Sequence, residues 1–550
     1  MKKSFALLLI AFATSVAQTV VLQTSLGKIR GLLRTSRVNP NVKFYHFLGV
    51  PYGCAPVGSL RFQEAVPVPP WTRVRNATFP GNRCVQLSKE FAGDQVLGDE
   101  DCLSLDIAVP ITARRNHRRL PVMVWIHGGS FLFATSYETQ ADPLMEEAVI
   151  VVNIQYRLNV FGFLSTGDDY APGNTGLKDQ TAALIWIQNH IHSFGGDRNR
   201  VTIFGGSAGG ASVQFHMLSR RSEGLFHRAI SQSGVTFGTW VFQTKPREKL
   251  RQLANALGLD HTNSATLVSQ LQEIPADVLL KTAFNQSITG PYLLYDEVPF
   301  NPIVEHESPT AFLSKRAFEL LRQGNFAKVP YMLGQVTEEG SFPYGYIDSG
   351  AIDIDDFEKN PELFIPISMN IPAGHPCIKE TVDAIHQFFF HNGSFTDKAN
   401  WIATMGQDVR GIQKSADLIC GRYRNYPIYF YVFSFVGTNS LNYAGGAGHY
   451  SEVLKLFYPV KEEWTVDPTV ADRLVQKRLV KLWTNFAYTG TPTPRRESAL
   501  QKVNLPTFCD RKSYLDIGDD LVVKHYPSRD VYNFWEGIFE KCGFPPYNTY

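Results

Sequence analysis

A glycine-rich turn around one serine constrains the fold of this chain more than any other feature. The pentapeptide Gly-Gly-Ser-Ala-Gly occupies residues 205–209 and directly follows the apolar run 201–204. A G-x-S-x-G pattern alone is weak evidence, because it also arises by chance as an ordinary turn with an incidental serine. Here small residues continue to Ala211, as is needed where a strained serine joins a strand to a closely packed helix. The sequence therefore predicts a strand, a sharp turn that exposes Ser207, and a helix.

Other apolar runs have the length and composition of strands that are buried on both faces. They cover residues 121–126, 149–154, 329–333 and 428–435, in addition to 201–204. Between them, residues 177–191 and 475–486 carry apolar side chains at helical spacing, and Gly490 ends the second pattern. Strands that alternate with helices predict an α/β fold, with a mostly parallel central sheet and helices on both of its faces.

Two longer segments, residues 251–321 and 348–423, have weaker helical patterns and few runs that resemble strands. In open α/β sheets the chemistry lies in loops beyond the carboxyl ends of the strands. We therefore expect the two segments to form a helical cap over that edge of the sheet.

The balance of charges argues against a nucleic-acid-binding protein. The 550 residues include 53 Lys and Arg against 51 Asp and Glu, a formal net charge of +2. Residues 1–17 begin with Lys2 and Lys3, continue with an apolar run and end in small residues, which is typical of a secretory signal peptide. The alternatives are a buried helix or a membrane anchor, but the run is too short to span a bilayer. We expect residues 18–550 to form one secreted domain without a membrane anchor.

An activated serine needs a base, a carboxylate that orients the base, and hydrogen-bond donors for an oxyanion. Residues 127–130, His-Gly-Gly-Ser, follow a predicted strand and offer free backbone amides as donors. Among the histidines beyond Ser207, His449 is the preferred base, because the glycine-rich loop 444–448 precedes it. Glu338 and Glu339 follow the run 329–333 in the same manner. Spacing alone does not choose between them, and either is also compatible with a solvated loop carboxylate.

Several motifs match those of one known family in the same order along the chain. They are Phe-Leu-Gly-Val-Pro-Tyr at 47–52, Glu-Asp-Cys-Leu-Ser-Leu at 100–105, the His-Gly-Gly turn at 127–129, residues 204–210, and Ala-Ile-Ser-Gln-Ser-Gly at 229–234. With these motifs the chain resembles a type-B carboxylesterase, from the cholinesterase-like branch of the α/β-hydrolases, over nearly its whole length. The resemblance implies an α/β-hydrolase fold and a serine hydrolase that cleaves carboxylic esters without a metal or an organic cofactor.

The resemblance also implies roles for individual residues. The catalytic residues are Ser207, Glu339 and His449, and the oxyanion hole is formed by the amides of Gly129, Ser130 and Ala208. Glu339 is chosen because the family pattern places the acid immediately before a glycine, here Gly340.

Two departures from the family pattern concern the substrate. Gly206 stands where the family most often has glutamate, which weakens any preference for cationic substrates, and Ser130 replaces the third glycine of the oxyanion turn. Cholinesterases hold choline against a tryptophan in the loop closed by the first disulfide, whereas residues 85–101 contain one aromatic residue, Phe91. Trp240 falls where relatives place a bulky wall of the acyl pocket, although a core position is equally compatible. We expect neutral esters with short or medium acyl groups as substrates.

Cysteines and sequons fit a secreted protein. The resemblance implies a disulfide between Cys84 and Cys102 and leaves open the pairing of Cys54, Cys377, Cys420, Cys509 and Cys542. Cys420 matches a family half-cystine, and either Cys542 or Cys509 is available in place of its usual partner. The N-x-S/T sequons at Asn76, Asn285 and Asn392 are candidate sites of glycosylation.

The sequence thus predicts a secreted carboxylesterase that acts on small-molecule esters through an acyl-enzyme intermediate. Two other functions use the same scaffold. A catalytically silent, neuroligin-like adhesion or binding protein typically lacks the serine, which this chain retains together with its two predicted partners. A lipase of this fold would show interfacial activation.

Overall fold

The strands of the computed structural model follow the predicted apolar runs closely. The structure describes residues 18–88, 95–114, 119–238, 240–289, 298–438, 442–460 and 467–545. The predicted signal peptide 1–17 and Phe91 lie outside the described residues.

The strands of the central sheet come from the whole length of the chain. They are β1 (Thr19–Thr24), β2 (Gly27–Thr35), β3 (Lys43–Pro51), β4 (Arg75–Asn76), β7 (Ser104–Pro110), β8 (Leu120–Ile126), β10 (Ile150–Ile154), β11 (Gly196–Gly206), β12 (Arg228–Gln232), β13 (Tyr331–Val336), β14 (Ile428–Phe433), β16 (Ser513–Ile517) and β17 (Leu521–His525). Two short antiparallel pairs lie outside the sheet, β5 (Gln86–Leu87) with β6 (Val96–Leu97) and β9 (Thr139–Gln140) with β15 (Tyr458–Pro459).

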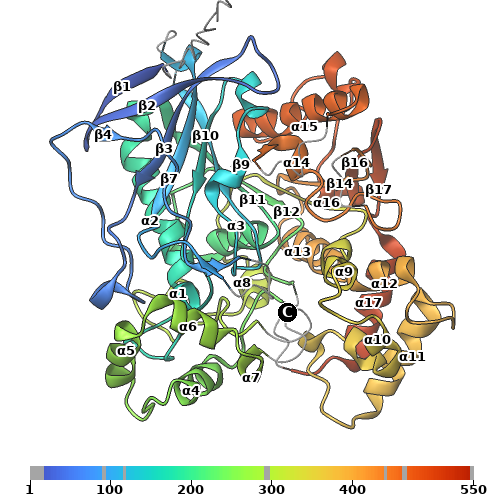
Figure 1. Cartoon of the computed structure of the whole chain (residues 1–550). Helices are drawn as coiled ribbons and strands as arrows, with labels where there is room; N and C mark the ends of the chain where they lie inside the picture. The colour runs from blue at the N-terminus through green and yellow to red at the C-terminus, as the bar shows by residue number, and fades with distance from the viewer. Residues whose placement is uncertain are drawn as a thin grey trace, which may run out of the picture.

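The middle of this sheet is parallel, as predicted. Among the described residues the strand order is β1-β2-β3-β7-β10-β8-β11-β12-β13-β14-β16-β17, and β4 pairs with β2 (Figure 1). All neighbours from β10 to β16 pair in parallel, whereas β1, β2, β3 and β7 at one edge and β17 at the other pair antiparallel. The carboxyl ends of the parallel strands therefore meet at one edge.

The α-helices of the described residues all follow β10 in the chain. They are α1 (Asn159–Phe163), α2 (Thr175–His190), α3 (Ala208–Leu218), α4 (Pro246–Ala256), α5 (Ser264–Glu273), α6 (Ala276–Ala283), α7 (Gln286–Thr289), α8 (Ala317–Gln323), α9 (Ser341–Asp348), α10 (Asp355–Lys359), α11 (Pro376–Phe389), α12 (Lys398–Met405), α13 (Asp408–Arg422), α14 (Val453–Leu456), α15 (Val470–Thr489), α16 (Phe508–Arg511) and α17 (Arg529–Cys542).

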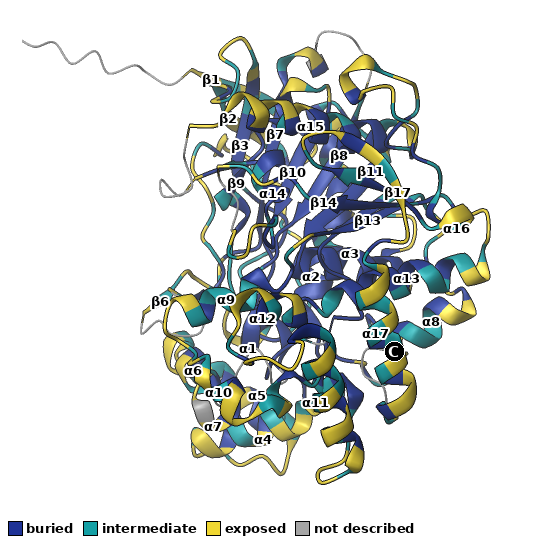
Figure 2. Cartoon of the chain, turned by 90° about the vertical axis from the view of Figure 1, so that its right-hand side faces the viewer, coloured by how far each residue is buried: buried dark blue, intermediate teal, exposed yellow. Residues whose placement is uncertain are grey.

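Both faces of the sheet are covered, because successive side chains of each parallel strand enter different cores. In β8, Val122 and Val124 pack in a core that includes buried residues of α2, α3 and α13, whereas Met123 and Trp125 pack in a second core with α14 and α15. This alternation explains why the strands appear in the sequence as continuous apolar runs. Figure 2 shows the buried strands in the middle of the molecule and exposed residues on the outer sides of the helices. The predicted α/β architecture is confirmed.

The two segments predicted to form a cap are helical. The first contains the second half of α4 and all of α5 to α7, and the second contains α10 to α13 (Figure 1). A third hydrophobic core joins α10, α11 and α12 to α17 around the fully buried Trp401 and Trp535. The cap therefore has a core of its own and can hold residues in fixed positions above the sheet.

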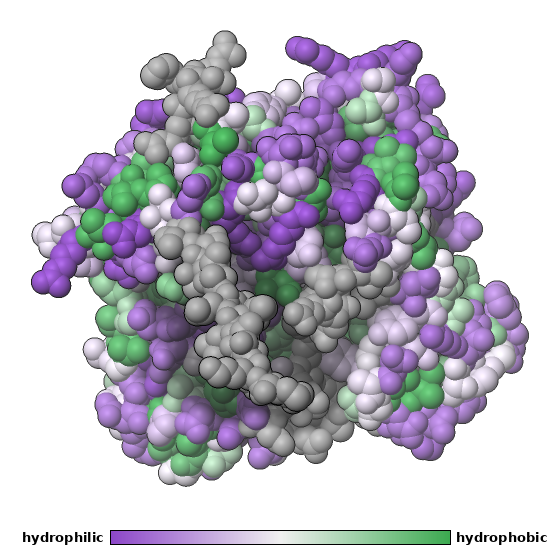
Figure 3. All heavy atoms as spheres, turned by 45° about the horizontal axis from the view of Figure 1, so that its top comes forward, coloured by the Kyte–Doolittle hydropathy of each residue, from purple (hydrophilic) through white to green (hydrophobic). Residues whose placement is uncertain are grey.

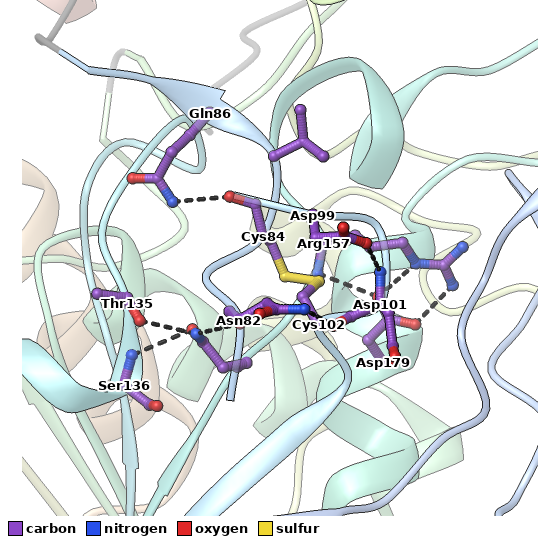
Figure 4. The surroundings of a disulfide bond; sticks show 12 residues. Asn82, Cys84, Gln86, Asp99, Asp101, Cys102, Thr135, Ser136, Arg157 and Asp179 are labelled. Carbon is purple, nitrogen blue, oxygen red and sulfur yellow. Dashed lines mark hydrogen bonds and ion pairs between the residues drawn. A yellow bond between two sulfur atoms is a disulfide. The ribbon is translucent and has the colours of Figure 1, made fainter. Parts of the chain in front are cut away.

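Disulfides tie these parts together. The structure contains Cys84–Cys102, Cys377–Cys542 and Cys420–Cys509, and Cys54 is the cysteine left unpaired. Close to the first disulfide, Gln86 donates to the carbonyl oxygen of Cys84 (Figure 4). Gln86 also donates to the carbonyl oxygen of Ala134, so the loop is held against the segment that follows β8. Cys420 pairs with Cys509, one of the two partners that the sequence left open.

One face of the molecule is mainly hydrophilic. Hydrophilic residues cover most of the face in Figure 3, and hydrophobic residues appear there in small separate areas. Within the described ranges, no helix combines the length and the apolarity that crossing a membrane requires.

Candidate active site

Ser207 lies in the turn between β11 and α3 and has a strained backbone. Its φ of 57° and ψ of −123° are unusual for a residue with a side chain, and its amide donates to the Gln232 carbonyl over 2.8 Å. The turn requires glycines. A Cβ at position 209 would lie 2.0 Å from the backbone carbonyl oxygen of Ile126, and one at position 234 would lie 2.0 Å from the backbone carbonyl oxygen of Ser207. These close contacts explain the small residues around the serine in the sequence.

The turn after β8 approaches this serine directly. A Cβ at position 128 would lie 3.1 Å from the Cβ of Ser207, so the two turns are in contact. Gly129 and Ser130 both have positive φ, 93° and 54°. Their amides donate to no group among the described residues, and the amide of Ala208 begins α3 and has no partner within the helix. Such amides can stabilise a developing oxyanion.

His449 is hydrogen-bonded to a carboxylate in the loop that follows β13. Its Nδ1 lies 2.5 Å from Glu339 Oε2, and the second oxygen of Glu339 accepts from the Val336 amide over 2.9 Å. The backbone amide of His449 donates to Ser341 Oγ over 2.7 Å. The carboxylate is thus held by a second hydrogen bond, and the backbone of His449 is held by its own bond to Ser341.

Glu338 has a different environment, although it adjoins Glu339 in the sequence. Its carboxylate accepts from the amides of Ala444 and Gly446, over 3.3 and 2.5 Å. It therefore holds the glycine-rich loop before His449, while Glu339 contacts the imidazole itself. Spacing could not separate the two glutamates because they differ by one residue; their hydrogen bonds do.

Burial and neighbouring charges shift the pKa of the His449 imidazole in opposite directions. Burial lowers the pKa of His449, but the hydrogen bond and charge of Glu339, with smaller contributions from Glu452 and Asp408, raise it above its ordinary value of 6.5. Glu452 is fully buried, and burial together with the charge of Glu339 raises its pKa to about 7. Sequence reasoning missed Glu452, which lies in the same loop region as His449 and carries no separate motif.

Ser207, Glu339 and His449 open into one pocket. It holds about 760 Å³ of space, its mouth included, and is lined by Ser130, Ser207, Trp240, Glu339, Phe342, Pro343, Leu363, Ile365, Pro366, Ile367, Met405, Gln407, Asp408 and His449. Among the contacts of the described residues, no hydrogen bond joins the Ser207 hydroxyl to the His449 ring. Catalytic hydrogen bonds often tighten only when substrate binds. The three side chains therefore border the same space, although Ser207 and His449 are not hydrogen-bonded to each other.

Trp240 lines this pocket and also packs on the core. Its ring centroid lies 6.2 Å from that of Phe131, and its indole N–H donates to Asp408 over 2.8 Å. Asp408 and Gln407 are pocket residues that sequence reasoning missed, because nothing in the cap segment distinguishes them before folding. The structure also gives a reason for the glycine at position 206 in place of the family's usual glutamate. A Cβ there would lie 2.9 Å from the Tyr450 ring, so a glutamate would require this ring to move.

Other predicted sites have simpler surroundings. Asn76, Asn285 and Asn392 are all exposed, as glycan attachment would require.

Among the described residues, a cluster of metal-ligating type joins Glu380 to Cys377 and Cys542, but the two sulfurs form a disulfide. This cluster does not have the free ligands of a metal site.

Comparisons with known proteins identify the family of this chain. The model of the carboxylesterase family matches residues 18–535. The chain is 32% identical to a carboxylic ester hydrolase of Bombus ignitus over 97% of both chains, and 33% identical to venom carboxylesterase-6 of Apis mellifera over 90% of both.

A solved structure extends the similarity to three dimensions. The structure of juvenile hormone esterase from Manduca sexta, with OTFP covalently attached, superposes with a TM-score of 0.81 at 28% identity, covering 95% of this chain and all of the other. The predicted α/β-hydrolase fold is thereby confirmed. With its Ser-, His- and Glu-lined pocket, the chain belongs to the carboxylesterase family of carboxylic ester hydrolases.

Proposed function

We propose that this enzyme hydrolyses esters in two steps, with Ser207 as nucleophile, His449 as general base and Glu339 as the orienting acid. The Ser207 oxygen bonds to the ester carbonyl carbon while its proton passes to the His449 ring. The amides of Gly129, Ser130 and Ala208 hold the oxyanion, and the ring then protonates the leaving alcohol. Water, deprotonated by the same ring, attacks the acyl-serine and releases the acid.

One observation carries this proposal: the buried Glu339–His449 pair and the strained Ser207 line a single pocket. The pair supplies a base whose charged form is stabilised, and the turn presents a hydroxyl beside unpaired amides. The relative with OTFP covalently attached supports a covalent route on this fold.

The proposed substrates are small neutral esters with short or medium acyl groups. Trp240, fixed at the pocket wall, limits the length of the acyl group. Gly206 leaves no carboxylate next to the nucleophile for a cationic alcohol. Relatives include proteins named juvenile hormone esterase and venom carboxylesterase, so hormone-like esters belong to the proposed substrates.

We also propose that residues 18–550 are one secreted domain, released from the signal peptide 1–17. Disulfides are typical of proteins that mature in oxidising compartments, and this chain has three. The exposed Asn76, Asn285 and Asn392 are the proposed glycan sites.

Active-site labelling tests the catalytic proposal. An organophosphate should attach to one serine of the secreted protein, identified as Ser207 by peptide mass spectrometry, and block hydrolysis of p-nitrophenyl acetate. Ser207→Ala should abolish labelling and turnover with no change in the thermal unfolding midpoint. Turnover that survives in Ser207→Ala would refute the mechanism.

The same protein separates the two alternative functions. A well-folded, secreted protein without activity on a broad ester panel would favour the adhesion or binding protein. A jump in rate when the substrate passes from monomers to micelles would favour a lipase.

A further inference from the structure

Tyr450, which directly follows the proposed base, has a strained backbone. Its φ is 76°, in the left-handed region that a bulky aromatic residue rarely adopts. Its carbonyl oxygen accepts from the amides of Val453 and Leu454 over 3.0 and 3.3 Å, so the start of α14 holds its backbone. Ser130 and Ser207 of the same site also have positive φ. Because such strain is common at functional sites, the conformation of Tyr450 indicates a functional position.

The Tyr450 ring lies where two neighbouring strands of the sheet end. Its centroid lies 6.5 Å from that of Trp125, near the end of β8, and the two rings meet edge to face. A Cβ at Gly206, the last residue of β11, would lie 2.9 Å from Cε2 of the tyrosine, so the ring packs directly on this glycine. The proposed oxyanion turn follows β8, and Ser207 follows β11. The ring therefore contacts the ends of both strands that lead to these two turns.

The phenol oxygen of Tyr450 is bound to the oxyanion turn itself. Burial raises the pKa of the phenol, and a hydrogen bond from the amide of Gly128 opposes this shift. A Cβ at Gly128 would lie 3.1 Å from the Cβ of Ser207, so the residue that Tyr450 binds is in contact with the nucleophile. Gly128 directly precedes Gly129 and Ser130, whose amides belong to the proposed oxyanion hole. A hydrogen bond at the Gly128 amide therefore restricts the orientation of this turn.

Tyr450 does not act on the substrate directly. Among the described residues, the lining of the catalytic pocket does not include it. Its ring centroid lies 6.3 Å from that of His449, with the ring planes 36° apart. Any effect of Tyr450 on catalysis is consequently exerted through the two turns that it contacts.

We propose that Tyr450 is a positioning residue that fixes the oxyanion turn relative to Ser207. This inference rests on the proposed function and adds a residue to it: the phenol oxygen holds the amide of Gly128, and the ring on Gly206 sets the distance between the two turns. Amides that receive an oxyanion must be placed for the transition state rather than for the substrate. Tyr450 therefore contributes to the rate of ester cleavage and not to substrate binding.

A pair of ketones separates these two effects. With 1,1,1-trifluorohexan-2-one, the Ser207 oxygen bonds to the ketone carbon, the carbonyl electron pair moves to the oxygen, and the serine proton passes to His449. The adduct carries its oxyanion where the transition state does. Hexan-2-one has the same butyl chain but a much less electrophilic carbonyl, so it reports binding of the ground state. Inhibition constants of both ketones are measured together with kcat/KM for ethyl pentanoate.

Tyr450→Phe removes the phenol oxygen and keeps the ring. Loss of this hydrogen bond should lower kcat/KM about tenfold and weaken inhibition by the trifluoroketone by the same factor, with inhibition by hexan-2-one unchanged. Tyr450→Ala removes the ring as well, and a turn displaced by about 1 Å should lower kcat/KM about a hundredfold. Tyr426→Phe is the matched control, because its phenol donates to the carbonyl oxygens of Ala327 and Val329 instead. This variant should leave the ratio of the two inhibition constants unaltered.

The contact between the ring and Gly206 has a test of its own. Gly206→Ala places a Cβ 2.9 Å from the Tyr450 ring and should lower kcat/KM in the wild-type enzyme. In the Tyr450→Ala background the added methyl group no longer meets the ring, so the loss caused by Gly206→Ala should be about tenfold smaller. Equal losses in the two backgrounds would overturn the role given to the ring.

The remaining outcomes are distinct. Unchanged kcat/KM in Tyr450→Phe, or equal weakening of inhibition by both ketones, overturns this inference and leaves the ester hydrolase mechanism in place. Tyr450→Phe carries the test should Tyr450→Ala not fold, since it keeps the ring and its packing. A wild-type enzyme that hydrolyses no ester, or a Ser207→Ala variant that retains activity, overturns both proposals.

Discussion

Replacing Glu339 with glutamine is expected to slow ester hydrolysis about a thousandfold while preserving the fold. Glu339 Oε2 lies 2.5 Å from His449 Nδ1, and the two side chains retain only 3% and 10% of their exposure. In the proposed mechanism the ring becomes a cation as the serine attacks, and this carboxylate stabilises it. Charges about 4 Å apart at an effective dielectric constant of about 20 interact by about 4 kcal/mol, which corresponds to about a thousandfold in rate.

The pH profile of the same variant provides a second readout. His449 acts as a base only when its ring is neutral, so the activity of the wild-type enzyme should rise through the raised pKa of His449, above 6.5. Without the charge of Glu339, burial of the ring remains the main influence and lowers that pKa. Glu339→Gln should therefore have a smaller kcat and an acid limb displaced towards lower pH.

Glu338→Gln is the matched control, because it removes the same charge one residue away. The glutamine oxygen can still accept from the amides of Ala444 or Gly446, so activity should fall less than about tenfold and the acid limb should move little. Stopped-flow or steady-state assays with p-nitrophenyl acetate across pH measure both effects. Equal losses in the two variants, or an unshifted acid limb in Glu339→Gln, would refute the assigned role of Glu339.

Three further predictions follow from packing. Gly234→Ala places a Cβ 2.0 Å from the backbone carbonyl oxygen of Ser207, so it should distort the turn. The substitution should lower the free energy of unfolding by about 1–3 kcal/mol in denaturant titrations and reduce labelling by the organophosphate. Loss of the Cys420–Cys509 disulfide, which spans 89 residues, should cost about 4–5 kcal/mol of unfolding free energy; a cost near zero in the Cys420→Ser/Cys509→Ser variant would contradict this pairing. Trp240→Ala should raise kcat/KM for decanoate relative to butyrate esters about tenfold or more, and an unchanged chain-length profile would assign Trp240 to the core alone.

The parallel strands could be predicted from the sequence because both of their faces are buried. Residues 121–126 alternate between two cores, so no polar residue interrupts the run. The antiparallel edge strands β1 and β2 have one exposed face and mixed composition, and their residues did not indicate strands. Strand β11 begins at Gly196, five residues before the predicted apolar run. The prediction began too late because residues 197–200 of the strand are polar.

Some residues of the site could likewise be predicted from local sequence patterns, whereas others reach the site only through long-range contacts. Ser207 and the turn at 127–130 carry local signatures, since strained turns between strands and helices need glycine at fixed positions. Asp408 reaches the pocket only because α13 packs in the cap, and its bond to Trp240 joins residues 168 positions apart. No local pattern encodes such a contact, so the place of Asp408 in the pocket lining was not predictable.

The carboxylates around His449 differ in function because their surroundings differ. Glu339 is bound directly to the ring. Glu452 is buried beside Gln232 and Tyr431, each 3.3 Å away, and its pKa of about 7 means that its charge appears only as the pH rises through neutrality. Asp408 faces the pocket and is bound to its wall. Activation of the serine in our proposed mechanism therefore depends on Glu339, whereas Glu452 adds negative charge near the ring only as the pH rises through about 7.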